Sequence, residues 1–367
     1  VWDELDAEEQ RVAARMEEVF AGFMEHTDVQ IDRLLTQLEA LGQRDDSLIM
    51  ALSDNGASSE GGPHGTYDHQ RARNGLGSSI ADNAERLDDM GGPLTYSHYP
   101  FGWAMAGNTP FKRYKGNTYA GGVRAPLLVS WPNGIAARGE TRRQFYHVVD
   151  VMPTVLDVLG APLPSRINGI EQIPLHGVSM AHTFADDDAA TQKETQYFET
   201  IGQRAIWHKG WKAVTFHQRG SDFNQDPWEL YHLDDDIAEL NNLAAEQPDK
   251  LRDLVDLWWR EADRYGVLPL DDMATRAGIG WQPDDRDRWV LYQDAVLPHF
   301  YRAAPRVRGL SHRITARIDR ETTERGGAII ADGGRFGGWC IYVRGNRMHY
   351  TTNSFGERSR VSSHLSL

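Results

Sequence analysis

Apolar residues recur every three or four positions over residues 7–41, which is the spacing of one face of an α-helix. Gly42 follows this stretch directly and supplies the stop signal of the helix. Residues 48–52 are consecutive apolar residues with the length and character of a strand buried on both faces, and residues 127–131 form a second such run. A long helix that leads into buried strands predicts an α/β domain, in which a mixed sheet carries helices on both faces.

The segment between the two strands, residues 56–110, has little periodicity and is rich in glycine, serine, asparagine and aspartate. Loops of this length in compact domains are usually functional or mobile, and only residues 80–90 favour a short helix. An aromatic cluster closes the segment, formed by Tyr96, His98, Tyr99, Phe101 and Trp103. These rings either wall an aryl or sugar ligand or anchor the loop to the core.

Asp150 is expected to begin the next helix as its N-cap, with Gly160 as its end. From residue 190 onward the pattern changes to short β-rich segments separated by turn residues. We expect strands at 195–200, 204–208, 211–216 and 228–233, followed by an amphipathic helix over 251–265. Together they predict a small antiparallel subdomain with one covering helix.

The chain therefore divides into an α/β domain over residues 1–190, the antiparallel subdomain over 191–265, a linker over 266–307 and a β-rich module over 308–367. Strands of the module are expected at 314–318, 328–331, 339–343 and 348–352. Short strands with glycine turns are typical of a β-sandwich or jelly roll, and the sequence ends before such a fold closes. Modules of this kind either bind carbohydrate or pack as appendages.

The composition, with 40% hydrophobic and 25% charged residues, is ordinary for a globular protein. A net charge of −14 argues against nucleic acid as a partner, because that binding needs a basic surface. No apolar run is long enough to span a membrane. The single cysteine, Cys340, excludes an internal disulfide and fits a buried strand. The chain begins at Val1 without an initiator methionine, so we expect it to be a fragment or a processed product.

Candidate chemistry begins where the first strand ends, in the sequence Ser53-Asp54-Asn55-Gly56. Open α/β sheets place their ligands outside the carboxyl ends of the strands. A carboxylate and a carboxamide side by side suit a hard divalent cation such as calcium or magnesium. The same four residues also make an ordinary turn, in which the side chains serve only the backbone.

Two further motifs follow in order: Gly61-Gly62-Pro63-His64-Gly65, and then Lys115 placed before Gly121-Gly122-Val123-Arg124. This combination resembles the type I sulfatases, the arylsulfatases of the alkaline phosphatase superfamily, and the chain resembles their C-terminal portion. The resemblance implies that Asp54 and Asn55 ligate a metal ion, calcium or alternatively magnesium. It also implies that Lys115 is the catalytic residue that holds the sulfate group of a small aryl or sugar sulfate ester.

Other residues remain open at this stage. His64 is either a substrate-binding residue or an ordinary solvated loop histidine. Lys112 and Arg113 are alternatives to Lys115, although their spacing to the Gly-Gly pair does not match the motif. Arg124 is expected to stabilise its loop rather than to contact substrate. Ala120 stands where many relatives carry an acid.

The nucleophile of the family is a formylglycine made from Cys or Ser in Cys/Ser-x-Pro-x-Arg, and this chain contains no such sequence. We therefore expect that group upstream of the chain. A phosphatase or phosphodiesterase of the same superfamily, and a non-catalytic carbohydrate-binding or scaffold protein, are the alternative functions.

Overall fold

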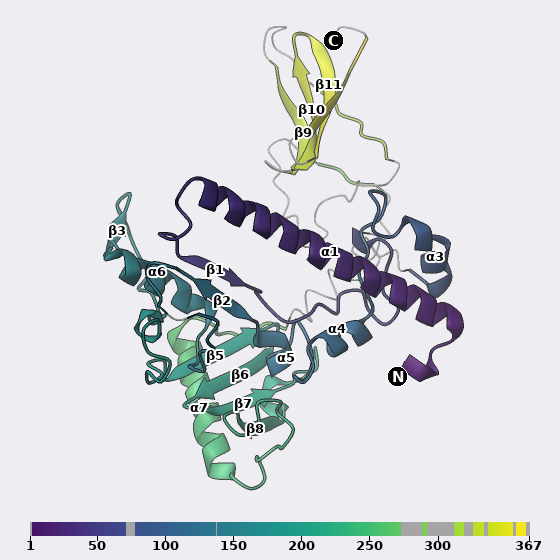
Figure 1. Ribbon diagram of the computed structural model, residues 1–367. Helices are drawn as coiled ribbons and strands as arrows, with labels where there is room; N and C mark the ends of the chain where they lie inside the picture. The colour runs from purple at the N-terminus through teal and green to yellow at the C-terminus, as the bar shows by residue number, and fades with distance from the viewer. Residues whose placement is uncertain are drawn as a thin grey trace. The chain divides into compact units, whose positions relative to one another are not determined.

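The computed structural model describes residues 2–70, 78–136, 138–272, 288–291, 312–318, 326–333, 337–354 and 357–364. The chain divides into two compact units, Val1–Ala304 and Pro305–Leu367. The first unit combines helices with small antiparallel sheets, which confirms the α/β class (Figure 1). The finer boundaries expected within residues 1–307 stay a prediction.

A long helix, α1 (Ala7–Ala40), opens the first unit as expected. It begins with a capping box, in which the Asp6 carboxylate accepts from the backbone N–H of Glu9 and the Glu9 side chain accepts from that of Asp6. Only the N-terminal half buries side chains, because Val12, Met16 and their neighbours pack against the segment that follows β1. That segment contains α3 (Ile80–Glu85), η2 (Leu87–Asp89) and α4 (Phe101–Gly107). A short turn, η1 (Trp2–Glu4), precedes α1.

The aromatic cluster of this segment anchors it to α1. The rings of Tyr99 and Phe20 meet edge to face at 5.0 Å between centroids. The indole N–H of Trp103 donates to the carbonyl of Ala13 at 2.9 Å. These rings therefore hold the loop to the core. The helix α4 within it was not expected from the sequence.

The two apolar runs form β1 (Ile49–Leu52) and β2 (Leu127–Ser130), which pair antiparallel in a two-stranded sheet. The expectation that they are buried on both faces is wrong for the described part of the chain. Leu128 is 69% exposed and Leu52 is 44% exposed. The described residues add no third strand to this pair. The apolar side chains of β1 and β2 therefore lack the covering layer that their sequences led us to expect.

The chain then runs through α5 (Ala120–Val123), η3 (Val148–Asp150) and α6 (Val151–Leu159), which ends at Gly160 with φ 60°. Asp150 occupies the N-cap position of α6, but its carboxylate makes no capping bond to that helix. It accepts instead from the backbone N–H groups of His147 and Val178 and from the ammonium of Lys193. The expected capping role is therefore replaced by a buried tie between three segments. Two short strands, β3 (Arg166–Ile167) and β4 (Ile170–Glu171), and a turn η4 (Ala181–Thr183) lead out of this region.

The expected antiparallel subdomain is present. Its sheet has the order β5-β6-β7-β8, and α7 runs along it (Figure 1). Buried Leu254, Trp258 and Ala262 of α7 form one core with Ile206 and Leu230 of the sheet. The elements are β5 (Thr195–Thr200), β6 (Gln203–His208), β7 (Trp211–Thr215), η5 (Phe223–Gln225), β8 (Trp228–His232) and α7 (Pro248–Arg264).

The second unit, within its described residues, is one antiparallel sheet of order β12-β11-β10-β9. Residues 314–318 do not form the strand that was expected, and the last strand was missed because its sequence is polar. The second sheet of a sandwich is not among the described residues, and much of the expected linker lies outside them. The strands are β9 (Gly327–Gly333), β10 (Gly337–Arg344), β11 (Arg347–Ser354) and β12 (Glu357–Ser362).

Among the helices that the structure describes, none is both long enough and apolar enough to cross a membrane.

Candidate functional site

Asp54, Asn55 and Lys115 line one cavity of about 660 Å³. The first two follow the end of β1, and Lys115 lies on the loop before α5. Residues of β5 and of the end of α7 line the same cavity. The structure thus brings together three residues that the sequence separates by about sixty positions. His64 does not line this cavity and is exposed to solvent.

Three glycines allow these segments to approach each other. The backbone N–H of Gly56 donates to the carbonyl of Gly122 at 3.1 Å. A Cβ atom on Gly56 would lie 1.7 Å from the carbonyl oxygen of Gly121, and one on Gly122 would lie 2.0 Å from that of Asn117. No other residue fits such backbone contacts, so the Gly-Gly pair is required by packing.

Of the two candidate lysines, Lys115 and Lys112, only Lys115 lines the cavity. Its backbone N–H donates to the carbonyl of Ala57 at 3.0 Å, and its ammonium lies 3.5 Å from a carboxylate oxygen of Glu60. This side chain remains 41% exposed, so its charge is accessible to a ligand. Lys112 points elsewhere, because its ammonium donates to the hydroxyl of Tyr231 at 3.0 Å.

The charges around the cavity suit a divalent cation. Four carboxylates line it, those of Asp54, Glu60, Glu199 and Glu261, against two ammonium groups, those of Lys115 and Lys193. The exposed carboxylate of Asp54 makes no hydrogen bond or ion pair within the described chain. The coordination shell is nevertheless incomplete, because no group of three or more His, Cys, Asp or Glu side chains among the described residues could hold a metal. Asp54 and Asn55 offer two side-chain groups to an ion that takes 6–8 oxygens.

One wall of the cavity carries groups that the sequence reasoning missed. Lys193 is 5% exposed and pairs with buried Asp150 at 2.9 Å. Tyr265 stacks on Tyr197 at 5.4 Å and lies 4.3 Å from the ring of His176. The position of Lys193 carries no local signal, and Asp150 was interpreted only as a helix start.

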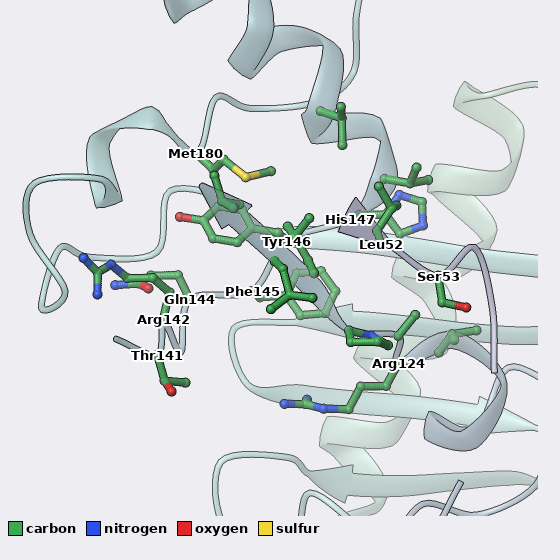
Figure 2. Close-up of a pocket in the computed structure, with 18 of the residues that line it drawn as sticks. Leu52, Ser53, Arg124, Thr141, Arg142, Gln144, Phe145, Tyr146, His147 and Met180 are labelled. Carbon is green, nitrogen blue, oxygen red and sulfur yellow. The ribbon is translucent and has the colours of Figure 1, made fainter. Parts of the chain in front are cut away.

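His147 also lies on this wall. Burial lowers its pKa below the ordinary value, and the nearby Lys193 ammonium lowers the pKa further, against the opposing effect of Asp150. Its Nδ1 accepts from the backbone N–H of Val149 at 3.4 Å. His147 also lines a second cavity, of about 760 Å³, along β1 and β2 (Figure 2).

Arg124 lines this second cavity together with Asp54, and it does not line the cavity that Lys115 reaches. Figure 2 shows Arg124 below Phe145 and Tyr146, and it shows Leu52 and Ser53 at the right of the view. Its guanidinium lies 5.4 Å from the ring centroid of Phe111, and burial lowers its pKa. The role of Arg124 in supporting its loop stays a prediction.

A buried ion pair ties the glycine loop to the antiparallel subdomain. The ammonium of Lys212 on β7 lies 2.6 Å from Oε1 of Glu239, and the two side chains are 3% and 0% exposed. The other oxygen of Glu239 accepts from the backbone N–H of Ala120 at 2.8 Å. The Glu239 carboxylate therefore lies beside the backbone of Ala120, and its hydrogen bond fixes the start of α5.

His217 and Ser221 resemble two members of a nucleophilic triad but do not form one. Nδ1 of His217 lies 2.7 Å from Asp226, and Nε2 lies 3.1 Å from Asp272. Ser221 is 3.5 Å from Nδ1, a nitrogen that Asp226 already occupies. The ring is fully buried, so no nitrogen is left to activate the hydroxyl. Arg204, 0% exposed and also paired with Asp226, completes a structural ion cluster.

An α/β domain with a carboxylate and carboxamide at a strand end, a neighbouring lysine and an antiparallel C-terminal subdomain defines a protein of the alkaline-phosphatase-like class. The sulfatase family profile matches residues 3–161. The profile described as N-sulphoglucosamine sulphohydrolase, C-terminal, matches residues 112–257. The chain belongs to the sulfatase family.

Named relatives agree with this assignment. An uncharacterised sulfatase of Schizosaccharomyces pombe is 30% identical over 282 residues, which are 76% of this chain and 49% of the relative. An arylsulfatase of Klebsiella aerogenes is 27% identical, over 49% of this chain and 37% of the relative. An N-acetylglucosamine-6-O-sulfatase of Bacteroides thetaiotaomicron is 27% identical, over 68% of this chain and 36% of the relative. The chain therefore spans half or less of the length of these relatives.

Among solved structures, Ps i-CgsB shares 22% sequence identity and superposes with a TM-score of 0.45, over 71% of this chain and 46% of that one.

Replacing Glu239 by glutamine tests the buried tie. Glu239→Gln keeps the size of the side chain but leaves the Lys212 ammonium buried without its counter-charge. We expect the free energy of unfolding, from denaturant titration, to fall by about 3–5 kcal/mol. Glu194→Gln is the control, because Glu194 and Lys209 form a pair whose side chains are 64% and 56% exposed. Equal effects of the two substitutions would show that burial of the first pair is unimportant.

His147 predicts a particular dependence of stability on pH. Because the pKa of His147 is lower in the folded protein, acid protonates the unfolded chain first. The contribution of this residue is fully present above its unfolded pKa of about 6.5 and is lost as pH falls through the folded pKa. We expect His147→Gln to lose less unfolding free energy than the parent chain between pH 7.5 and pH 5.5. A parallel decline in both proteins would contradict this sign.

Proposed function

We propose that the protein to which this chain belongs is an arylsulfatase-type sulfuric ester hydrolase, which converts a sulfate ester and water to an alcohol or phenol and sulfate. The observation that carries the proposal is the convergence of Asp54, Asn55 and Lys115 on one cavity in a chain of the sulfatase family. The proposal concerns the whole protein, of which this chain supplies the electrostatic part of the site.

Lys115 is proposed to hold the sulfate group. Expulsion of an alcohol from sulfur builds negative charge on the oxygens that remain, so a fixed cation stabilises the transition state more than the ground state. An ammonium is a compact point charge with three donors, which suits a tetrahedral anion. The ammonium lies 3.5 Å from Glu60 at the cavity. This ion pair is partly exposed and therefore weak, so a sulfate oxygen can replace the Glu60 carboxylate as the partner of the ammonium.

Asp54 and Asn55 are proposed to hold a divalent cation, with calcium as the first choice and magnesium as the alternative. The excess of carboxylates over ammonium groups around the cavity supports this assignment. When bound, the cation supplies further positive charge to the sulfate oxygens. Asp54 and Asn55 offer oxygen donors and no thiolate or imidazole, a ligand type that favours calcium or magnesium over zinc.

A small aryl or sugar sulfate is the proposed substrate class. The ring stack of Tyr197, Tyr265 and His176 lines the cavity and offers a flat wall to a ring-containing alcohol.

The first test replaces the lysine in the complete enzyme. Lys115→Ala should lower kcat/KM for 4-nitrophenyl sulfate by about 2–4 kcal/mol of transition-state stabilisation. Folding should survive, because the side chain is partly solvated and leaves no buried cavity. Lys112→Ala, at the neighbouring lysine outside the cavity, should retain far more activity. Unchanged kinetics in Lys115→Ala, with activity lost in Lys112→Ala, would show that the wrong lysine was assigned.

The second test measures metal content in the complete protein. Asp54→Ala should remove most of the bound calcium and Asn55→Ala less, because a carboxylate neutralises the ion whereas a carboxamide only coordinates it. Elemental analysis of the folded, dialysed proteins gives the content directly. A calcium content of Asp54→Ala equal to that of the parent would refute the assignment.

The third test uses the 367-residue chain itself, which should not turn over 4-nitrophenyl sulfate even with added calcium. It contains no Cys/Ser-x-Pro-x-Arg sequence, and free water is a poor substitute for a nucleophile held in line with the leaving oxygen. Turnover by the purified chain, absent from a matched preparation of Lys115→Ala, would require a nucleophile among the residues present.

A further inference from the structure

The second unit has a charge opposite to that of the rest of the chain. Residues 305–367 contain eleven arginines, no lysine and five carboxylate side chains, a formal charge of +6 within a chain of net charge −14. The residues before 305 therefore carry −20. Such segregation of charge within one chain is typical of a surface that receives an anionic partner.

The strand register places four of these arginines on one face of the sheet. Arg344 and Arg347 are direct partners across the turn between β10 and β11. Arg358 pairs with Asn353, and Arg360 pairs with Thr351, which itself pairs with Cys340. Side chains of directly paired residues share a face, and residues two apart on a strand do so as well. We call this surface the arginine face: Arg344, Arg347, Arg358 and Arg360.

The arginine face is open and contains no acid among its described residues. All four arginines are exposed, and none of them forms an ion pair with a carboxylate in the described part of the unit. Glu357 pairs with Ser354, and Asp332 pairs with Trp339, so both carboxylates lie on the opposite face.

An aromatic pair lies between the arginines. The rings of Tyr342 and His349 stack at 5.1 Å between centroids. The Thr351 hydroxyl donates to the Tyr342 hydroxyl at 3.4 Å and lowers its pKa, and a hydrogen bond from Arg360 and the charges of Arg360 and Arg344 act in the same direction. His349 is fixed from both sides, because Nδ1 lies 2.7 Å from the hydroxyl of Ser362 and Nε2 lies 3.1 Å from the carbonyl of Arg344. The face thus combines forked cationic donors with a rigid ring surface.

We propose that the arginine face binds a sulfated polysaccharide, the polymeric form of the esters on which the cavity of the first unit acts. Guanidinium groups bind tetrahedral oxyanions through paired N–H donors, and stacked rings accept the flat faces of sugars. Arg358 and Arg360 lie two residues apart on β12, about 7 Å along the strand, and the Tyr342–His349 row separates Arg360 from the Arg344–Arg347 pair. The charges are therefore spread along the face, which suits an extended anionic chain better than a single small anion. The choice of sulfate over phosphate rests on the proposed function, whereas the binding of a polyanion rests on the face alone.

Binding of fluorescein-labelled dextran sulfate to the 367-residue chain, followed by anisotropy, tests the proposal. The variant Arg344→Gln/Arg347→Gln/Arg358→Gln/Arg360→Gln should bind at least about tenfold more weakly, and the slope of log K against log salt should fall by about 3. The control removes equal charge from exposed, carboxylate-paired arginines of the first unit: Arg11→Gln/Arg44→Gln/Arg252→Gln/Arg264→Gln. The control should bind as the parent does. Unlabelled dextran should not compete.

Several outcomes would overturn the proposal. An equal loss of dextran sulfate affinity in both quadruple variants would mean that binding depends on the net charge of the chain and not on the arginine face. Competition by double-stranded DNA as strong as that by dextran sulfate would identify a general polyanion or nucleic-acid surface. Lys115→Ala separates the two sites: it should leave dextran sulfate binding unchanged, and a loss of binding would place the polymer in the cavity. Because this assay needs no turnover, it can fail while the hydrolase assignment stands, and the reverse also holds.

Discussion

The contact between Gly56 and the Gly121–Gly122 pair is the constraint on which the site depends. It brings the turn after β1 against the start of α5, at distances that exclude any side chain. The same approach places Asp54 and Lys115 on one cavity, because each lies a few residues from the contact. The glycines therefore contribute by allowing the two backbones to approach, and this approach sets the positions of the charged side chains.

The antiparallel subdomain contributes to the site in two ways. Glu239 accepts from the backbone N–H of Ala120 and pairs with buried Lys212, so the first turn of α5 is attached to β7. Tyr197 and Tyr265, from β5 and from the end of α7, supply the ring wall of the cavity that Asp54 also lines. The subdomain is thus part of the site rather than an appendage to it.

Much of this arrangement followed from sequence patterns. The strands of the subdomain and α1 were predicted within a few residues, because their apolar spacing is regular and their ends carry turn or capping residues. Asp54, Asn55 and Lys115 were found through a motif whose order is specific. Their roles stay predictions, although their convergence on one cavity supports them.

Other features had no local signal. Lys193 and Asp150 meet across 43 positions, and no spacing rule announces such a pair. The strand β12 was missed because its face is occupied by arginines, which give no apolar alternation. The burial expected for β1 and β2 failed for a different reason, since it depends on neighbouring elements that the described chain does not supply.

The shortness of β1 and β2 has a consequence for cooperativity. Each strand pairs over only four residues, and an isolated pair of this size is marginally stable in water. The turn that follows β1 then draws part of its order from the subdomain, through the glycine contact and Glu239. In hydrogen exchange, the amides of Gly56 and Gly121 should therefore belong to the same foldon as the β5–β8 sheet. A core substitution on α7, although remote in sequence, would therefore lower the fraction of molecules in which the turn after β1 is ordered, even before a ligand binds.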